Sequence, residues 1–481
     1  MSETTSEPRH GFRMRWWMWV IAVVLLLFTA MVSIHLAGFA RYRALQNELR
    51  SSGYPVTPVE FVALGPAVDA DRQARLWPLV SWPGPKWQDA ISQTKVRPPF
   101  NELSEQQPPL AVDLAKRDQA LKDAVYDLDA LSTILAEGPC VVSVYGWIER
   151  DPTRLATIDI SQSEQSKTPN LLAVRSIVTA LATRACLDTN PMPELRRLES
   201  FQRTLDHPGV LIDAMISISA TKIRDDAILW LATRGRVGTE TLLPWVAEPP
   251  LQLQWCADGY AGERCIWQEP FSRLNWGFSG VIGSDSAFLA DMLAFLVEWP
   301  IQGYDLTVCS SRVAQVEAGL LGKPVPSGCN MPLGIPPLLT NIILPNLQEC
   351  AVTAIEAATQ HRLKRCAALI SAAYRRDGIL PATLPPEAQG LRVNDNIPAL
   401  IYERLSPSRF RIGTDPSGLR PPLIPVVRWK PGYVSTIGSP PSSSKSNVVG
   451  RWSLEIDLDA ILIPPPEKPV AIPKPPTTLP P

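Results

Sequence analysis

The sequence is poor in histidine, lacks the cysteine pairs of metal sites and has no excess of charge of either sign. It contains four histidines, and none of its eight cysteines form a C-x-x-C pair, so we expect no metal centre. Basic and acidic residues number 46 and 47, whereas nucleic-acid-binding proteins usually carry a basic excess. No constellation of residues stands out from chance as a catalytic or cofactor site. We therefore expect no cofactor and no nucleic acid among the ligands.

Proline, by contrast, is abundant. It accounts for 49 of the 481 residues, roughly twice its share in average proteins. Such a content predicts short elements joined by extended connectors. Apolar residues make up 45 %, which is typical of a folded globular chain rather than a disordered one. The length is sufficient for one large domain or for two or three smaller ones.

An apolar stretch near the N-terminus has the length and composition of a transmembrane helix. Residues 20–28 (VIAVVLLLF) form an unbroken apolar run inside a longer charge-free stretch. As a helix, residues 17–37 would cover about 30 Å, which is the thickness of the hydrocarbon layer of a membrane. Three tryptophans lie at its start, where an interfacial aromatic belt is expected. We therefore predict a transmembrane helix at residues 16–38.

The predicted topology rests on the unequal flanks of this helix. The N-terminal flank is short, whereas the remainder is long, rich in proline and holds all eight cysteines. We predict that residues 1–15 form a cytoplasmic tail and that the body lies on the extracytoplasmic side. A cleavable signal peptide is the alternative, because residues 38–40 (GFA) resemble a cleavage site. However, the apolar region exceeds the usual length of about 7–15 residues, and in either case the body is exported.

The cysteines of the exported part permit disulfide bonds in an oxidising compartment. Cys186, Cys350 and Cys366 fall in helical patterns, where a small buried apolar residue is the common role. Cys309 and Cys329 flank the start of a proline-rich stretch at residues 324–348, and we predict a bond between them. In the chain-entropy model, closing a loop of about 20 residues would stabilise the fold by roughly 3 kcal/mol.

Helical patterns dominate the chain up to about residue 376, and strand patterns follow. Helices are expected to continue from the transmembrane segment to Leu49, to start at Thr57, and to cover residues 114–135, 168–187, 193–206, 209–234, 286–298 and 346–376. Strands are expected at residues 399–403, 409–412, 424–429 and 451–457. We expect Pro300 to end one helix and residues 324–348 to form a buried loop. The sequence thus predicts a mainly α fold with a small C-terminal α+β element of antiparallel strands.

The pattern divides the chain into five predicted segments. They are a cytoplasmic tail (1–15), a transmembrane helix (16–38), a helical extracytoplasmic domain (39–345), a long helix with a small antiparallel sheet (346–460) and a proline-rich disordered tail (461–481). In the fourth segment we expect Gly378 to end the long helix. We also expect Tyr374 to fold over the hairpin that carries Ile401 and Phe410.

Two stretches resemble a family of uncharacterised bacterial single-pass membrane proteins. They are residues 49–61 (LRSSGYPVTPVEF) and 368–384 (ALISAAYRRDGILPATL), and residues 410–415 (FRIGTD) resemble the strand that follows the second. The same helix-to-strand pattern is similar to the C-terminal half of type II secretion pseudopilins, where a long stem helix joins a small antiparallel sheet. Gly11-Phe12 resembles a prepilin cleavage point, but Trp16 stands where that family has its glutamate. The resemblance implies a topology and a local fold, not an activity.

One short motif points to an enzyme. Ser219-Ala-Thr-Lys222 matches the S-x-x-K of serine acyl-transferring enzymes, in which the lysine can assist the nucleophile. Residues 284–286 (SDS) and 430–432 (KPG) follow in the order of that family's other motifs, but both depart from them. A match to S-x-x-K arises by chance about once in a chain of this composition. An exported serine hydrolase is therefore kept as an alternative function.

Five basic residues lie close together on the predicted long helix: Arg362, Lys364, Arg365, Arg375 and Arg376. Such a group can contact an anionic surface. More often it is a solvated helix face, which the helix dipole favours near the C-terminus, and we expect this arrangement.

These patterns predict a membrane-anchored extracytoplasmic binding or scaffold protein of unknown ligand, rather than an enzyme. The resemblance places it in the bacterial inner membrane. Its expected partners are the membrane, through the N-terminal helix, and an envelope protein. The alternatives are a pseudopilin-like component of envelope assembly or secretion, and the exported serine hydrolase.

Overall fold

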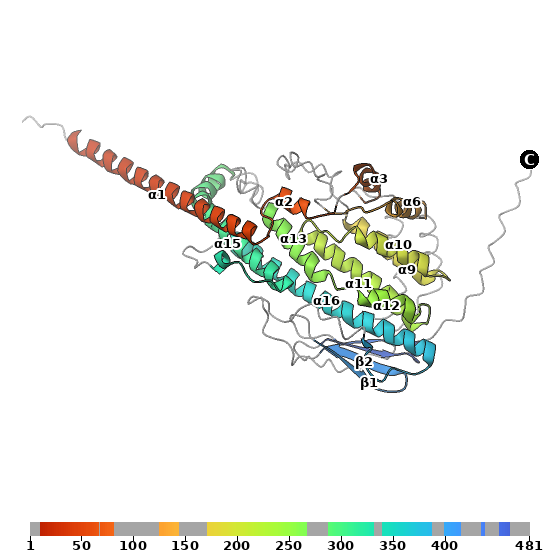
Figure 1. Ribbon diagram of the computed structural model, residues 1–481. Coiled ribbons are helices and arrows are strands. Elements are labelled where there is room, and N and C mark those ends of the chain that lie inside the picture. The colour runs from red at the N-terminus through yellow and green to blue at the C-terminus, as the bar shows by residue number, and fades with distance from the viewer. Residues whose placement is uncertain are drawn as a thin grey trace, which may run out of the picture.

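The computed structural model describes residues 10–66, 68–80, 125–143, 171–266, 287–330, 339–386, 399–414, 434–437 and 452–461. They form a mainly helical body with a small sheet along one side (Figure 1). The helices are α1 (His10–Ser51), α2 (Pro58–Ala63), α3 (Ala70–Val80), α6 (Val125–Ala136), α9 (Leu171–Leu187), α10 (Met192–Arg203), α11 (Leu211–Thr233), α12 (Thr239–Ala247), α13 (Gln252–Ile266), α15 (Ala287–Leu321) and α16 (Leu339–Asp377), with a 3-10 turn at Ser327–Asn330. The strands are β1 (Leu400–Arg404), β2 (Arg409–Thr414), β3 (Val434–Ile437) and β4 (Ser453–Asp457). The predicted mainly α fold class is confirmed.

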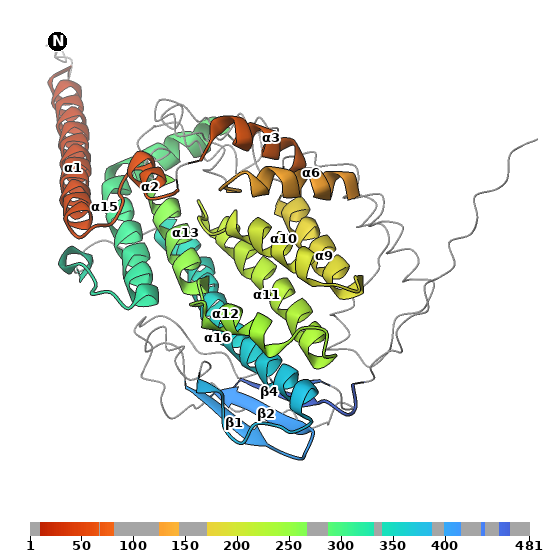
Figure 2. The same cartoon turned by 45° about the vertical axis from the view of Figure 1, so that its right-hand side comes forward.

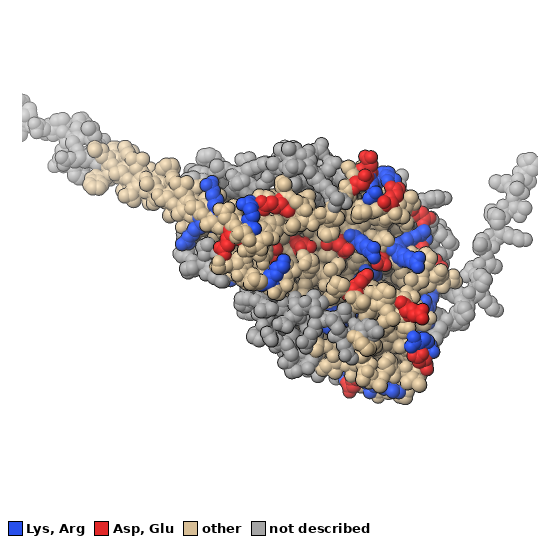
Figure 3. Space-filling model, viewed as in Figure 1, with Lys and Arg blue, Asp and Glu red and all other residues tan. Residues whose placement is uncertain are grey.

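Helix α1 has an exposed apolar half and a packed half. The apolar half projects from the body, and no charge is seen along its described side chains (Figures 1 and 3). Among the described residues, α1 is the one helix that is long and apolar enough to cross a membrane. Its second half lies against α15, and Tyr42, Leu45 and Leu49 are buried there. The 42 residues of α1 form one continuous helix, so no linker separates the two halves.

Two glycines bring α1 and α15 so close that their backbones touch. A Cβ atom added to Gly303 of α15 would lie 2.5 Å from the carbonyl carbon of Gly38. A Cβ atom added to Gly38 of α1 would lie 2.9 Å from Cδ2 of Tyr304. Small residues at helix crossings permit this kind of approach, and any larger residue would push the helices apart. The crossing lies at the end of the predicted transmembrane segment.

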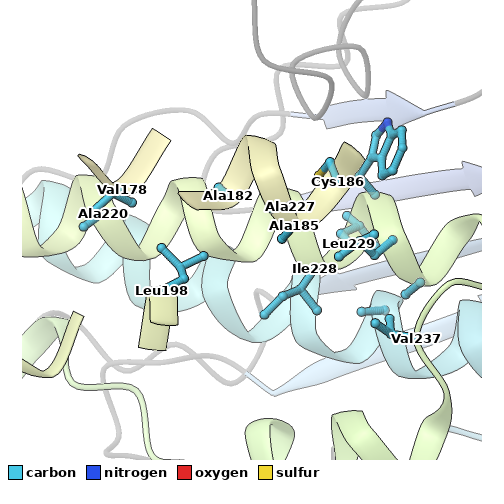
Figure 4. Packing of buried hydrophobic residues seen from close by; sticks show 14 of the residues in the cluster. Val178, Ala182, Ala185, Cys186, Leu198, Ala220, Ala227, Ile228, Leu229 and Val237 are labelled. Carbon is cyan, nitrogen blue, oxygen red and sulfur yellow. The ribbon is translucent and has the colours of Figure 1, made fainter. Parts of the chain in front are cut away.

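Helix α11 runs through the middle of the body. It lies beside α9, α13 and α16 (Figure 2), and 16 of its 23 residues are buried. Ala182 and Ala185 of α9 and Ala220 and Ala227 of α11 belong to one buried cluster, where their small side chains let the two helices pack closely (Figure 4). The prediction of a helix at residues 209–234 is confirmed. Because α11 is covered on most sides, its charged residues Asp213, Arg224 and Asp225 are buried, whereas Lys222 is exposed.

The sheet has the strand order β1-β2-β4-β3. The pairs β1–β2 and β2–β4 are antiparallel, as predicted, whereas β3 pairs with β4 in parallel. The strand predicted at residues 424–429 lies outside the described residues, and β3 was not expected. Parallel neighbours need a connection of about a dozen residues or more, and residues 438–452 supply it.

Helix α16 covers the inner face of this sheet. Phe410, Ile412, Leu454 and Ile456 are buried in one cluster with residues of α9, α11 and α16. This cluster crosses the predicted boundary at residue 346, so α16 shares a core with the helices that precede it. As predicted, α16 ends at Gly378, whose φ of 71° is easily reached by glycine alone.

The predicted place of Tyr374 is confirmed in part, because its half-buried ring packs against the cluster that contains Phe410. Its hydroxyl donates a hydrogen bond to Asp459, which follows β4, at 2.9 Å. Ile401 is 41 % exposed, and the ring beside Phe410 is that of Tyr402, with centroids 6.1 Å apart. The spacing of apolar residues gave the buried face of α16 but carried no information on which strand end lies below it.

The effect of two prolines also differs from the prediction. Helix α15 continues through Pro300 to Leu321, and α16 begins at Leu339, before Pro345. The prediction that Pro300 ends a helix is wrong, and part of the expected loop at residues 324–348 is helical. Proline removes one hydrogen bond of the helix. A long helix packed on α1 and α13, as α15 is, keeps its remaining bonds and contacts.

Candidate functional site

Charged side chains are buried between α11 and α16. Arg224 and Asp225 of α11 are 7 % and 1 % exposed, and His361, Arg362 and Arg365 of α16 are 3 %, 2 % and 1 % exposed. The prediction of a solvated basic face is therefore wrong for Arg362 and Arg365. We call the five residues the charged seam.

The other basic residues of α16 have partners as well. Lys364 forms an ion pair with Asp226 of α11 at 2.5 Å. Arg375 donates to the backbone carbonyl oxygens of Thr233 and Leu458, both at 2.7 Å, and so joins α11, α16 and the end of β4. Of the predicted group, Arg376 is exposed as expected.

His361 and Asp225 form the centre of the charged seam. Nδ1 of His361 is hydrogen-bonded to Oδ2 of Asp225. Burial lowers the pKa of His361 to about 4, although Asp225 opposes this shift. Burial raises the pKa of Asp225, but His361, Arg224 and Arg365 outweigh it and the pKa is lowered. At neutral pH the ring is therefore neutral and donates from Nδ1 to a carboxylate, which fixes the tautomer and leaves Nε2 as an acceptor.

Two cavities flank this pair. The larger, of about 310 Å³, lies between α11 and α16 and is lined by Ser219, Lys222, Glu356, Gln360 and Lys364 among others. The smaller, of about 130 Å³, is lined by Arg203, Asp206, Arg224, Glu248 and Arg365 among others. Thr221, Gln252 and His361 line both cavities, so the two share a wall. Together they form one polar site, which we call the paired cavity.

The wall of the paired cavity contains acceptors without a donor. The Oε1 atoms of Gln252 and Gln202 are buried and have no hydrogen-bond partner, and Gln252 is 1 % exposed. The amide nitrogen of Gln202 donates to Thr221, which fixes the orientation of that side chain. Buried polar atoms in folded proteins nearly always have a hydrogen-bond partner. An unpaired acceptor in the wall of a cavity therefore indicates a bound ligand or water molecule.

The arginines of the smaller cavity differ in their partners. Arg365 donates to the backbone oxygen of Glu248 at 2.6 Å and to its carboxylate at 3.3 Å, and it stacks 4.9 Å from the ring centroid of Trp245. Arg203 pairs with Glu199 at 2.6 Å near the surface. Arg224 makes no hydrogen bond in the described structure, and its nearest carboxylate oxygen, Oδ1 of Asp225, is 3.9 Å from Nε.

Asp206 adds a titratable group to the smaller cavity. Burial raises the pKa of Asp206 to about 7, although Arg224 and Arg203 oppose the shift. Its charge therefore changes near neutral pH, and with it the net charge around Arg224.

The motif residues Ser219 and Lys222 both line the larger cavity, as do Asp225 and His361. Ser219 and Asp225 are six positions apart on α11, which is about 9 Å along a helix axis. The structure therefore brings serine, lysine and histidine to one cavity without a described contact between serine and histidine. The other two motif candidates, residues 284–286 and 430–432, lie outside the described residues.

The predicted Cys309–Cys329 bond is not formed in this structure, where both residues are buried free thiols. The backbone oxygen of Cys329 accepts hydrogen bonds from Ser311 and Gln315 of α15, both at 2.7 Å. Cys309 lies two positions before Ser311, or about 200° round the helix, so it leaves α15 on a different side. The bond stays a prediction, to be tested by non-reducing peptide mapping.

No protein-family model, no curated protein and no solved structure matches this chain. The functional argument consequently rests on the site itself. Sequence reasoning missed Arg224, Asp225 and His361 as site residues. The available signal was the run Arg224-Asp225-Asp226 in the middle of an otherwise apolar helix, because charges there must be buried together with partners or beside a cavity.

Proposed function

We propose that this chain is a membrane-anchored binding protein and that the paired cavity between α11 and α16 is its ligand site. The observation that supports the proposal is the set of buried polar groups with unused hydrogen-bonding capacity around that cavity, above all Oε1 of Gln252. A volume of about 310 Å³ is at the lower end of the range of small-molecule sites, which favours a small polar ligand.

A matched pair of glutamines on α13 tests this proposal. Small molecules that co-purify with the full chain in detergent are identified by mass spectrometry, and their affinity is measured by calorimetry. Gln252→Leu removes the orphan acceptor and should abolish retention of the ligand. Gln254→Leu, two positions away on the exposed side of the helix, should leave retention unchanged. Equal retention by both variants would exclude the paired cavity as the site.

The anchoring part of the proposal places residues 16–38 in the bacterial inner membrane, with the body on the extracytoplasmic side. Support comes from the exposed apolar half of α1. Protease added to spheroplasts should degrade the chain after about Ala40 and leave a tag at Ser2 intact. A protected body would refute the proposed orientation.

The exported serine hydrolase is a second candidate because Ser219 and Lys222 share the larger cavity with His361. In this mechanism Ser219 would attack an acyl group, with Lys222 as the base. A screen of ester and amide substrates against the wild type, Ser219→Ala and Lys222→Ala tests it. Activity that is unchanged in both variants would rule out this reading.

The pseudopilin-like alternative has less structural support. The helix that covers the sheet is α16, whereas the apolar helix is α1, at the other end of the chain (Figure 1). Anchor and stem are thus separate helices. Cross-linking in membranes, followed by identification of envelope partners, distinguishes an assembly component from a protein that binds small molecules.

A further inference from the structure

Arg224 is an almost fully buried cation whose donors are unused. It is 7 % exposed and lines the smaller cavity, and its Nε is buried without an acceptor. The guanidinium group makes no hydrogen bond in the described structure. Guanidinium is a planar fork of donors that matches the two oxygens of a carboxylate or phosphate group. A buried guanidinium group that lines a cavity can therefore bind a carboxylate or phosphate group there.

The surrounding carboxylates leave the guanidinium donors of Arg224 without a hydrogen-bond acceptor. Arg365 is matched by Glu248, and Arg203 is matched by Glu199. Asp225 is hydrogen-bonded through Oδ2 to His361 rather than to Arg224. The carboxylate of Asp225 lies 3.9 Å from Nε of Arg224 and offsets its charge, but it accepts no hydrogen bond from the guanidinium group, whose donors stay open to an acceptor in the smaller cavity. Asp206 is the remaining carboxyl group there.

We propose that the smaller cavity binds an oxyanion, the carboxylate or phosphate group of a small ligand, through the guanidinium group of Arg224. The inference deepens the proposed binding function and rests on it. The 130 Å³ of the smaller cavity suit one such group with few attached atoms. The oxyanion is the feature that the ligand must carry.

The experiment is calorimetric titration of the full chain in detergent micelles with three probes of similar size: inorganic phosphate, acetate and neutral acetamide. The wild type should bind at least one of the two anions and bind acetamide at least tenfold more weakly. Binding of phosphate alone identifies a phosphate group, and binding of acetate alone identifies a carboxylate. If neither anion binds, the proposal is overturned.

Variants of Arg224 separate the contribution of the planar guanidinium group from that of its positive charge. Arg224→Gln should weaken binding of the anion at least tenfold, and Arg224→Lys should recover only part of the affinity because it restores the charge without the fork. Arg196→Gln, at an exposed arginine of α10 that lines neither cavity, should change the affinity less than threefold. Equal loss in Arg196→Gln and Arg224→Gln would indicate a general effect of charge and refute the specific role of Arg224.

A second readout guards against loss of folding. Removal of a buried cation without a hydrogen-bonded partner should leave the thermal unfolding temperature of Arg224→Gln equal to that of the wild type or higher. A large decrease would mean that Arg224 supports the fold, and would contradict the proposal. A neutral polar ligand whose binding requires Gln252 but not Arg224 would preserve the proposed function and refute the oxyanion.

Discussion

Arg264 and Arg224 are both buried arginines, but they lie in different surroundings. Arg264 of α13 is 1 % exposed and donates to Oε2 of Glu317 on α15 at 3.0 Å. The ring of Tyr54 lies 5.6 Å from its guanidinium carbon. Arg224 of α11 has no hydrogen-bonded partner and lines a cavity. The first arginine joins two helices, whereas the second points at a space that the chain does not fill.

The comparison shows why burial alone does not identify a functional charge. Desolvating a charge is costly, and a protein offsets this cost with a partner in the fold or with a ligand. At Arg264 the partner is Glu317, which accepts a hydrogen bond from Nη2, although Nε and Nη1 of Arg264 are buried without one. Burial raises the pKa of Glu317 to about 7, and Arg264 opposes this shift. At Arg224 the nearest carboxylate, that of Asp225, lies 3.9 Å from Nε and accepts no hydrogen bond from it.

The largest expected effect is a difference in stability between two equivalent substitutions. Arg264→Leu leaves Glu317 buried without its partner and should lower the free energy of unfolding by about 3–5 kcal/mol. Arg224→Leu removes a cation that has no hydrogen bond, and should lower it by less than about 1 kcal/mol. Urea denaturation of both variants in the same micelles measures the difference. Similar losses would mean that Arg224 is a structural residue like Arg264.

An effect of intermediate size is expected for the pH dependence of stability. It extends the comparison to His361 and Asp225, which are hydrogen-bonded to each other within the charged seam. The folded-state pKa of His361, about 4, is below its ordinary value of 6.5. The unfolded state therefore binds more protons between pH 4 and 6.5, and stability falls as the pH is lowered through this range, by roughly 3 kcal/mol in all. In His361→Gln the slope of unfolding free energy against pH should be smaller over the same range.

The control for this slope is His207→Gln. Burial lowers the pKa of His207 as well, but the residue lines neither cavity and has no carboxylate as a cause of its shift. His207→Gln should leave most of the slope in place. A slope that persists unchanged in His361→Gln would show that the ring is not the buried neutral group described above.

The smallest expected effect concerns the affinity of the oxyanion. Because the pKa of Asp206 is about 7, this carboxyl group is neutral at pH 6 and charged at pH 8. A carboxylate near Arg224 competes with an anion, so binding should weaken about three- to tenfold between pH 6 and 8, equivalent to roughly 1 kcal/mol. Asp206→Asn should remove this dependence. Binding that strengthens with pH would contradict the assignment of Asp206.

Much of the fold was predictable because it follows from local patterns. Residues 209–234 have the apolar composition of a helix, and the structure gives α11 at Leu211–Thr233. Gly378 has the conformational freedom that ends α16, and the hairpin formed by β1 and β2 alternates as strands do. Local steric and hydrophobic preferences act over a few residues, which is the range that a sequence pattern covers.

The site was not predictable in the same way because its partners are far apart in the chain. Arg365 pairs with Glu248 over 117 positions, and His361 pairs with Asp225 over 136. The basic group on α16 has the same local sequence whether solvent or α11 covers it. Its burial depends on the packing of α16 against α11 and α12, which no local spacing encodes.

The unbroken course of α1 has a mechanical consequence. The apolar half of α1 and the half packed on α15 at the Gly38–Gly303 crossing belong to one continuous helix. No flexible linker therefore joins the body to the apolar half. Membrane helices respond to lipid thickness by changing their tilt, which averages about 20°. If α1 spans a bilayer, a change in its tilt would rotate the whole body, which a flexible linker would prevent. The lipid thickness would then set the direction in which the paired cavity faces.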